Sequence, residues 1–157
     1  MTLAHTPPED TMNTPTRFAE DHYACGQPTA AQLAGLAREG VRTVINLRGP
    51  AEPVEYDEAA EAARLGLRYV ELPITGPADL DRERVRAFGR MLDEARREGG
   101  VLIHCATSNR VGAMVALDEA LNRGRPLQDA IAHGRAAGLA SLEPAVTALA
   151  EREGAAR

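Results

Sequence analysis

The sequence of 157 residues is 44% hydrophobic and 26% charged, which is ordinary for one globular domain with a sizeable core. Its net charge of −5 argues against nucleic acid or an anionic membrane as the main partner, because both attract basic surfaces. The two cysteines, Cys25 and Cys105, are too few for a secreted disulfide scaffold, so we expect a reducing, cytoplasmic compartment.

The start of the chain differs in composition from the rest. Residues 1–16 are rich in Pro, Thr and acidic residues, without the basic and apolar regions of a signal peptide. We therefore expect a disordered lead-in over 1–16, followed by a single domain over 17–157. No apolar run is long enough to span a bilayer. The four histidines are scattered and no metal-ligand cluster is present in the sequence, so no metal or other cofactor is expected.

Apolar runs alternate with segments of helical periodicity along the domain. The expected strands are 18–25, 41–47, 67–74 and 99–105. The expected helices are 29–39 with Thr29 as N-cap, 56–65, 80–98, 110–122, 126–137 and 142–153. This alternation predicts an α/β fold, with a mostly parallel central sheet of four to five strands flanked by helices on both faces. Ligands of such folds bind beyond the carboxyl ends of the strands, and Cys105 lies at one of these ends.

The 105–110 loop joins a buried strand to a helix and carries the residues best suited to chemistry. Backbone N–H groups at a helix N-terminus and the guanidinium of Arg110 can together hold a tetrahedral oxyanion above Cys105. The same positive potential favours the thiolate of Cys105, which is the nucleophilic form. Arginine is disfavoured at a helix N-terminus by the helix dipole, and an anion bound there explains its presence.

These residues carry a resemblance to a known family. The stretches "CGQPTAAQLAGLAREGVRTVINLR", "AEP", "GLRYVELPI" and "HCATSNRVGA" resemble the bacterial beta-lactamase hydrolase-like domain of the cysteine-dependent dual-specificity and tyrosine phosphatases, over about residues 23–149. The resemblance implies a tyrosine-phosphatase-like fold and hydrolysis of phosphotyrosine-type or small aryl phosphates through a phosphocysteine, without a metal. It implies Cys105 as nucleophile and Arg110 as phosphate clamp. The phosphate would be bound by the loop residues Ala106, Thr107, Ser108, Asn109 and Arg110.

Three departures from the phosphatase pattern keep alternatives open. Four residues separate Cys105 from Arg110, where typical tyrosine phosphatases have five, whereas the beta-lactamase hydrolase-like group and the rhodaneses both have four. Ser108 stands where a loop glycine is usual, and a positive φ there would strain a serine. Val111 replaces the hydroxyl residue that normally helps the thiolate leave, so low activity is expected. The alternatives are a sulfurtransferase using a Cys105 persulfide and a non-catalytic oxyanion-binding module.

The general acid is not apparent from the sequence. Asp79 and Asp81 are the candidates in the loop after the strand 67–74, with Asp79 preferred. Asp81 begins a helix, where an acidic residue is favoured in any case. The third possibility is that no protein side chain serves as the acid. At the position where dual-specificity phosphatases place it, this chain reads Thr75-Gly76.

Other residues near the expected site have simpler interpretations. His104 is expected to be a buried imidazole that hydrogen-bonds the loop. Cys25 is interpreted as a small core residue rather than a resolving thiol, and Gln27 as part of a turn. Arg48 and Glu52 are expected to form a surface ion pair, or else part of the substrate rim.

Overall fold

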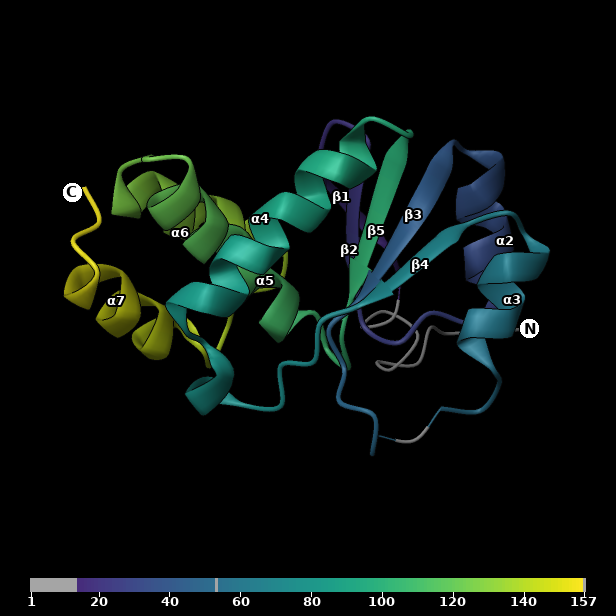
Figure 1. Ribbon diagram of the computed structural model, residues 1–157, viewed down its shortest axis with the longest axis horizontal. Helices are drawn as coiled ribbons and strands as arrows, with labels where there is room; N and C mark the ends of the chain where they lie inside the picture. Colours follow the sequence, from purple (N-terminus) through teal and green to yellow (C-terminus); the bar gives the residue numbers. More distant parts are fainter. Residues whose placement is uncertain (1–13, 53, 157) are drawn as a thin grey trace, which may run out of the picture.

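A five-stranded sheet forms the centre of the computed structural model, which describes residues 14–52 and 54–156 (Figure 1). The strands are β1 (Thr16–Ala19), β2 (His22–Cys25), β3 (Val41–Asn46), β4 (Arg68–Glu71) and β5 (Gly100–His104). Their order is β1-β2-β5-β3-β4, with β1 antiparallel to β2 and every other neighbouring pair parallel. The predicted α/β fold with a mostly parallel sheet is confirmed.

The start of the sheet differs from the expectation. The single strand predicted over 18–25 is wrong, because the chain reverses there and forms the hairpin of β1 and β2. Asp21 makes the reversal possible with a φ of 60°, in the left-handed region that aspartate tolerates better than most residues. Thr16 already belongs to β1, while residues 1–13 of the expected lead-in lie outside the described residues.

Helices cover both faces of the sheet (Figure 1). Helices α2 (Ala30–Arg38) and α3 (Glu58–Arg64) lie on one face, and α4 (Arg82–Arg96), α5 (Asn109–Leu117), α6 (Leu127–Ala136) and α7 (Glu143–Arg152) lie on the other. Thr29 caps α2 with a full capping box, as predicted, and Asp81 caps α4. The helix predicted over 110–122 changes after Leu117 into a wider π-helical turn, Asp118–Asn122.

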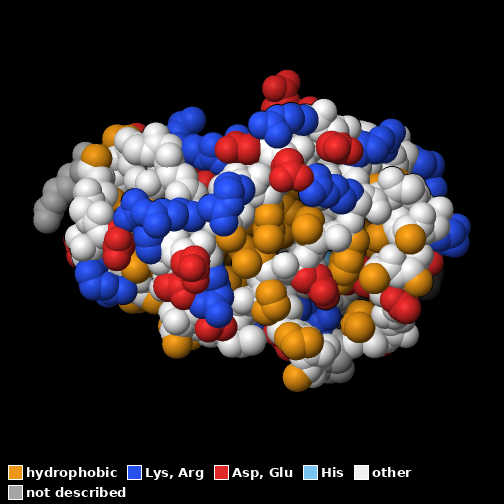
Figure 2. Space-filling model, viewed as in Figure 1, with side chains coloured by type: hydrophobic (Ala, Val, Ile, Leu, Met, Phe, Trp, Pro, Cys, Tyr) orange, Lys and Arg blue, Asp and Glu red, His pale blue; other side chains and the backbone are white. Residues whose placement is uncertain are grey.

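The two faces bury separate apolar clusters, because successive side chains of a strand point to opposite faces. On β5, Leu102 packs with the α2–α3 side, while Ile103 packs with the α4–α7 side. Figure 2 shows hydrophobic side chains gathered between α4 and β4. Val70 of β4 and Met91 of α4 are partly buried hydrophobic residues that pack against the larger cluster. In the part of the chain that the structure describes, no helix is both long and apolar enough to cross a membrane.

Two glycines allow α5 and α6 to approach closely. A Cβ atom at Gly112 would lie 2.0 Å from the backbone nitrogen of Leu139 and 2.5 Å from the carbonyl oxygen of Gly134. A Cβ atom at Gly134 would in turn lie 2.7 Å from the carbonyl oxygen of Gly112. These are backbone contacts that no side chain fits between, so α6 fixes the position of α5, the helix that follows the 105–110 loop.

Candidate active site

The carboxyl ends of four parallel strands form one row of functional side chains. In the strand register, Cys25 of β2 pairs with His104 of β5, His104 with Asn46 of β3, and Asn46 with Glu71 of β4. Cys105 follows His104 directly, so the predicted nucleophile lies at this edge of the sheet. The expectation that the site lies beyond the strand ends agrees with this placement.

The 105–110 loop turns sharply between β5 and α5. Cys105 is fully buried, and its amide donates to the carbonyl of Cys25 at 3.3 Å. Ser108, the N-cap of α5, has a φ of 73°, a positive value that strains a serine where a glycine would adopt it freely. Within the described residues, the amides from Ala106 to Arg110 donate to no backbone carbonyl. They are therefore available to an anion, as the first N–H groups of a helix generally are.

Contacts from the far side hold this loop in place. The Ser108 hydroxyl donates to the carbonyl of Ala137 at 2.7 Å. The Asn109 side chain points to the α6–α7 connection, where its oxygen accepts from the amide of Ala140 at 2.8 Å and its amide donates to Ser141 at 2.8 Å. Asn109 can therefore offer an anion its backbone amide, while its side chain is engaged elsewhere.

Arg110 is bound on one edge by a carboxylate. Its Nη1 and Nη2 donate to the two oxygens of Glu52 at 2.7 and 2.8 Å, and Nη1 also donates to the carbonyl of Ile74 at 2.7 Å. The hydrogen bonds to Glu52 raise the pKa of Arg110 most; burial opposes the rise, and the neighbouring Cys105 adds to it. Cys105 and Arg110 are thus brought together.

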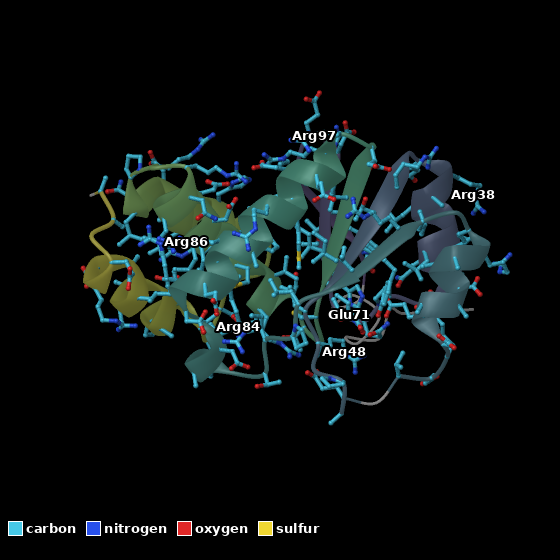
Figure 3. The ribbon with its side chains drawn as sticks, viewed as in Figure 1. Arg38, Arg48, Glu71, Arg84, Arg86 and Arg97 are labelled. Carbon is cyan, nitrogen blue, oxygen red and sulfur yellow. The ribbon has the colours of Figure 1, made fainter. Side chains whose placement is uncertain are left out.

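Arg48 and Glu52 are not a simple surface pair. Arg48 is only 7% exposed, and Glu52 approaches its Nε at 3.6 Å. Glu52 also accepts from the amide of Gly49, and its bonds to Arg110 lower its pKa to about 2. In Figure 3, Arg48 and Glu71 lie near the carboxyl end of the sheet. Glu52 therefore orients Arg110, a role that was not predicted from the sequence.

His104 has a partner that was not predicted from the sequence. Its Nε2 lies 2.5 Å from Oε2 of Glu58, and the two side chains are 0% and 4% exposed. Glu58 is the first residue of α3, where an acidic residue is explained by the helix dipole alone, so no sequence signal distinguished it. The expected buried imidazole is found, but its described bond goes to α3 rather than to the 105–110 loop.

The candidate acids are engaged elsewhere. Oδ2 of Asp79 accepts from both the amide and the hydroxyl of Thr75, at 2.8 and 2.6 Å, and these bonds lower the pKa of Asp79. A general acid needs the opposite, a carboxyl group that keeps its proton near neutral pH. Asp81 caps α4 by accepting from the amide of Arg84. Neither contact is the kind that would prepare a proton donor.

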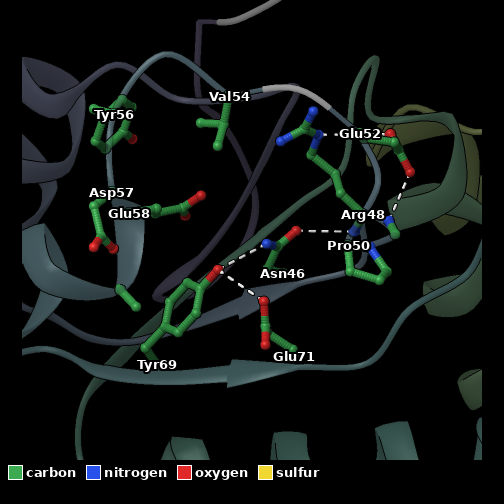
Figure 4. A pocket seen from close by; sticks show the side chains of 12 residues that line it. Asn46, Arg48, Pro50, Glu52, Val54, Tyr56, Asp57, Glu58, Tyr69 and Glu71 are labelled. Atoms are coloured by element: carbon green, nitrogen blue, oxygen red, sulfur yellow. Dashed lines mark hydrogen bonds and ion pairs between the residues drawn. The ribbon is translucent and has the colours of Figure 1, made fainter.

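Two cavities adjoin the site. One, of about 570 Å³, is lined by Gly49, Pro50, Ala51, Glu52, Thr75 and Arg110. The other, of about 310 Å³, lies beside it and contains the Arg48–Glu52 pair, Asn46, Tyr69 and Glu71 (Figure 4). Burial raises the pKa of Tyr69 to about 12, so its hydroxyl stays protonated. Among residues 14–52 and 54–156, no three side chains of His, Cys, Asp or Glu gather as a metal site requires.

Comparisons with known proteins agree on one family. The family model described as "DSP-PTPase phosphatase fused to NAD+ Kinase" matches residues 5–143. A beta-lactamase hydrolase-like protein of Xylella fastidiosa is 37% identical over 118 residues, which cover 69% of this chain and 26% of that protein. The dual specificity protein phosphatase TpbA of Pseudomonas aeruginosa is 31% identical over 116 residues, covering 73% and 50%. The chain thus spans about a quarter of the first relative and half of the second.

Solved structures give the same result. The structure of Pseudomonas aeruginosa TpbA in complex with phosphotyrosine superposes with a TM-score of 0.70 at 25% identity, covering 94% of this chain and 86% of that one. A DUF442 protein of Shewanella putrefaciens superposes with a TM-score of 0.73 over 96% and 97%, and at 21% identity it supports the fold alone. From the family model, these relatives and the 105–110 loop, we conclude that the chain belongs to the dual-specificity and tyrosine phosphatases, in the family described as DSP-PTPase phosphatase fused to NAD+ kinase.

Proposed function

We propose that the chain is a cysteine-dependent phosphatase that hydrolyses phosphate monoesters of the phosphotyrosine or small aryl type. In the first step, the Cys105 thiolate attacks phosphorus, the ester P–O bond breaks, and the leaving oxygen takes a proton. In the second step, water attacks the phosphocysteine, the S–P bond breaks, and phosphate and the thiolate are released. Arg110 and the amides of Ala106, Thr107, Ser108 and Asn109 hold the three other phosphate oxygens throughout.

One observation carries this proposal: Glu52 and Ile74 leave the Nε–Nη2 edge of Arg110 open to a phosphate, and Arg110 also contacts Cys105, the proposed nucleophile. A guanidinium has five N–H groups. Three of those on Arg110 donate to Glu52 and Ile74. The two that remain, on Nε and Nη2, lie on one edge of the guanidinium plane and match two oxygens of a phosphate. Since Glu52 holds the adjoining Nη1–Nη2 edge, Arg110 needs no reorganisation when the substrate binds.

The cavity beside Arg110 supports an aryl ester. Its walls are mostly uncharged, with Pro50, Ala51 and Thr75 around the position where a leaving group would lie. A ring can pack there without burying a charge, whereas a second phosphate would meet the carboxylate of Glu52. The relative TpbA was solved with phosphotyrosine, which favours the same substrate class.

For the general acid, we infer that Asp79 does not serve in the described conformation, because its contacts favour the ionised form. Asp79→Asn should therefore lower kcat/KM for phenyl phosphate less than about threefold, and kcat/KM is the quantity to compare because it reports the first step even when breakdown of the phosphocysteine limits kcat. Loss of a true general acid costs about 100-fold or more. The poor leaving group makes the assay sensitive, and Asp81→Asn is the matched control. A fall of about 100-fold in Asp79→Asn alone would establish Asp79 as the acid.

Low absolute turnover is part of the proposal. Val111 is buried and has no hydroxyl to stabilise the departing thiolate of Cys105 in the second step. Slow breakdown predicts that the phosphocysteine accumulates, and a burst of phenol in rapid-mixing experiments would reveal it. A steady rate from the first turnover would place the slow step before the intermediate.

A paired assay tests the function itself. The wild type and Cys105→Ser are each measured for aryl phosphate hydrolysis and for sulfur transfer from thiosulfate to cyanide. We expect hydrolysis by the wild type alone and no sulfur transfer by either. Sulfur transfer that depends on Cys105 would support the persulfide alternative, and phosphate binding without turnover would support the binding module. We further propose a cytoplasmic location with neither nucleic acid nor membrane as partner, in keeping with the two free thiols.

A further inference from the structure

A continuous chain of polar contacts joins the two ends of the 105–110 loop. The chain runs through His104, Glu58, Gln27, Arg48, Glu52 and Arg110. Its members come from β5, the start of α3, the connection after β2, the connection after β3 and α5. One end precedes the nucleophile, and the other end is the phosphate clamp.

The middle of the chain is a glutamine held between opposite charges. Arg48 Nη1 donates to Gln27 Oε1 at 2.6 Å, and Gln27 Nε2 donates to Glu58 Oε1 at 3.0 Å. An arginine can only donate and a carboxylate can only accept, so these neighbours fix the orientation of the Gln27 amide. A turn alone explains Pro28 and the chain reversal, but it does not require an amide at this position.

The His104 end is equally constrained. Glu58 Oε1 accepts from Gln27, and Oε2 faces His104 Nε2 at 2.5 Å, so the carboxylate uses both oxygens as acceptors. The proton of the imidazole is then on Nε2, and within the described residues the buried Nδ1 has no hydrogen-bond partner. A buried imidazole with one strong bond keeps one ring orientation, which holds the residue directly before Cys105.

We propose that Gln27 and Glu58 are positioning residues that hold the His104–Cys105 end of the loop in register with Arg110. The proposal rests on the proposed function, because register matters most when both ends must contact one phosphoryl group. Neither residue touches the substrate: Glu58 acts through His104, and Gln27 acts by linking Glu58 to Arg48. Displacement of a reacting group by about 1 Å can cost 100-fold in rate, which is the scale on which such residues act.

A reciprocal exchange tests the chain. Gln27→Glu places one carboxylate against another, and Glu58→Gln removes the acceptor pattern that Gln27 and His104 need. Each single variant should lower kcat about 10- to 100-fold with KM changed less than about threefold, as the loss of partners that orient active groups does. In the double variant, the carboxylate now at position 27 can accept from Arg48, while the amide now at position 58 can donate to that carboxylate and accept from His104. Its kcat should therefore return to within about threefold of the wild type.

The control and the conditions separate positioning from stability. Gln32→Glu makes the same substitution on the neighbouring helix, where the side-chain oxygen accepts from the amide of Thr29 and glutamate can do the same. Its kcat should equal that of the wild type. All rates are measured at a temperature where circular dichroism shows every variant folded. A single variant that does not fold is replaced by Gln27→Met, which removes the bonds to Arg48 and Glu58 and adds no charge.

A second readout does not depend on turnover. The rate at which iodoacetate alkylates Cys105, followed by peptide mass spectrometry, measures the reactivity of the thiol at the start of the 105–110 loop. The concentration of vanadate that protects Cys105 measures the affinity of the loop and Arg110 for an oxyanion. Both should change in the single variants and recover in the double variant. If the wild type does not hydrolyse aryl phosphates, the proposed function fails, and these two measurements still decide the inference. Single variants within threefold of the wild type in all readouts, or a double variant no better than the worse single variant, would overturn it.

Discussion

Cys25 is the last residue of β2, and Cys105 directly follows the neighbouring parallel strand β5; both are buried, with exposed fractions of 1% and 0%. They nevertheless belong to different apolar clusters. Cys25 packs with Leu33 and Leu36 on the α2–α3 side, and Cys105 packs on the α4–α7 side beneath α5. Burial, followed by the nearby Cys105 and Glu58, raises the pKa of Cys25. Each of these influences disfavours the thiolate of Cys25.

Cys105 has the opposite neighbours. Arg110 contacts it, and the first turn of α5 presents amides without backbone acceptors beside it. Cys25 and the proposed nucleophile Cys105 therefore differ in the charges and dipoles that they face rather than in their depth. Cys25 pairs with His104, so Cys105 lies one position further along, just after the neighbouring strand. Because successive side chains point to opposite faces of a sheet, the two cysteines meet different neighbours.

The largest effect expected from this comparison is on activity after replacement of each thiol. Cys105→Ser should lower aryl phosphate hydrolysis by about 10⁴-fold or more, since it removes the nucleophile. Cys25→Ser should keep kcat within about threefold and cost about 1–3 kcal/mol of stability, because it buries a hydroxyl. Steady-state kinetics and urea unfolding measure both. Comparable loss of kcat in the two variants would mean that Cys25 shares in the reaction.

Arg110 contacts Cys105, and its replacement tests whether this contact distinguishes Cys105 from Cys25. Arg110→Lys keeps the charge but loses the planar fork that two phosphate oxygens require, so kcat should fall by about two to three orders of magnitude. Arg64→Lys, at an exposed arginine paired with Glu61, is the control and should change little. Initial rates over a range of aryl phosphate concentrations give kcat and KM separately. In a sulfurtransferase, Arg110→Lys would instead mainly raise the KM for the anionic sulfur donor, because a point charge can still hold it.

A smaller effect is expected at Gly138, in the segment that packs against the 105–110 loop. Gly138 has a φ of 113°, and a Cβ atom there would lie 2.6 Å from Ser108. Gly124 has a φ of 72° but faces open space. Gly124→Ala should cost about 1–2 kcal/mol from backbone strain alone. Gly138→Ala should cost about 1–3 kcal/mol more and should lower kcat as well, because the serine must move. Equal losses of stability with unchanged kcat in both variants would show that Gly138 does not support the loop.

The smallest effect concerns Glu52, whose pKa of about 2 lies below its ordinary value of 4.5. A carboxyl group with a lowered pKa in the folded state stabilises the fold above pH 4.5, and that stability is lost as the pH falls towards 2. Between about pH 5 and about pH 3, the free energy of unfolding of the wild type should therefore fall by about 1 kcal/mol more than that of Glu52→Gln, after allowance for solvent screening. Parallel pH profiles of the two proteins would contradict the Glu52–Arg110 assignment.

Much of the fold was predictable, because hydrophobic periodicity depends on neighbours in the sequence. The apolar run before His104 identified a buried strand, and the helix starts at Thr29 and Asp81 followed from capping chemistry. The hairpin at Asp21 was missed, since one residue of positive φ leaves little trace in a short apolar segment.

The site was predictable only where its residues are close in sequence. The strand end at Cys105 and the helix start at Arg110 stand together in one loop, so their proximity could be inferred. Glu58 and Gln27 could not be inferred, because a turn and a helix dipole already explain them and their contacts span separate connections of the sheet. Glu52 was considered with Arg48, and its stronger partner, Arg110, became visible only through the strand arrangement.

The close approach of Gly112 and Gly134 has a consequence for how the chain tolerates change. Any side chain at either position separates α5 from α6, and because α5 begins in the 105–110 loop, the loop moves with it. Sensitivity to substitution should therefore extend from the nucleophile into α6, to positions that contact no substrate. In a saturation mutagenesis experiment selected for hydrolysis, Gly134 would stand out among the residues of α6 as the one at which even alanine is rejected.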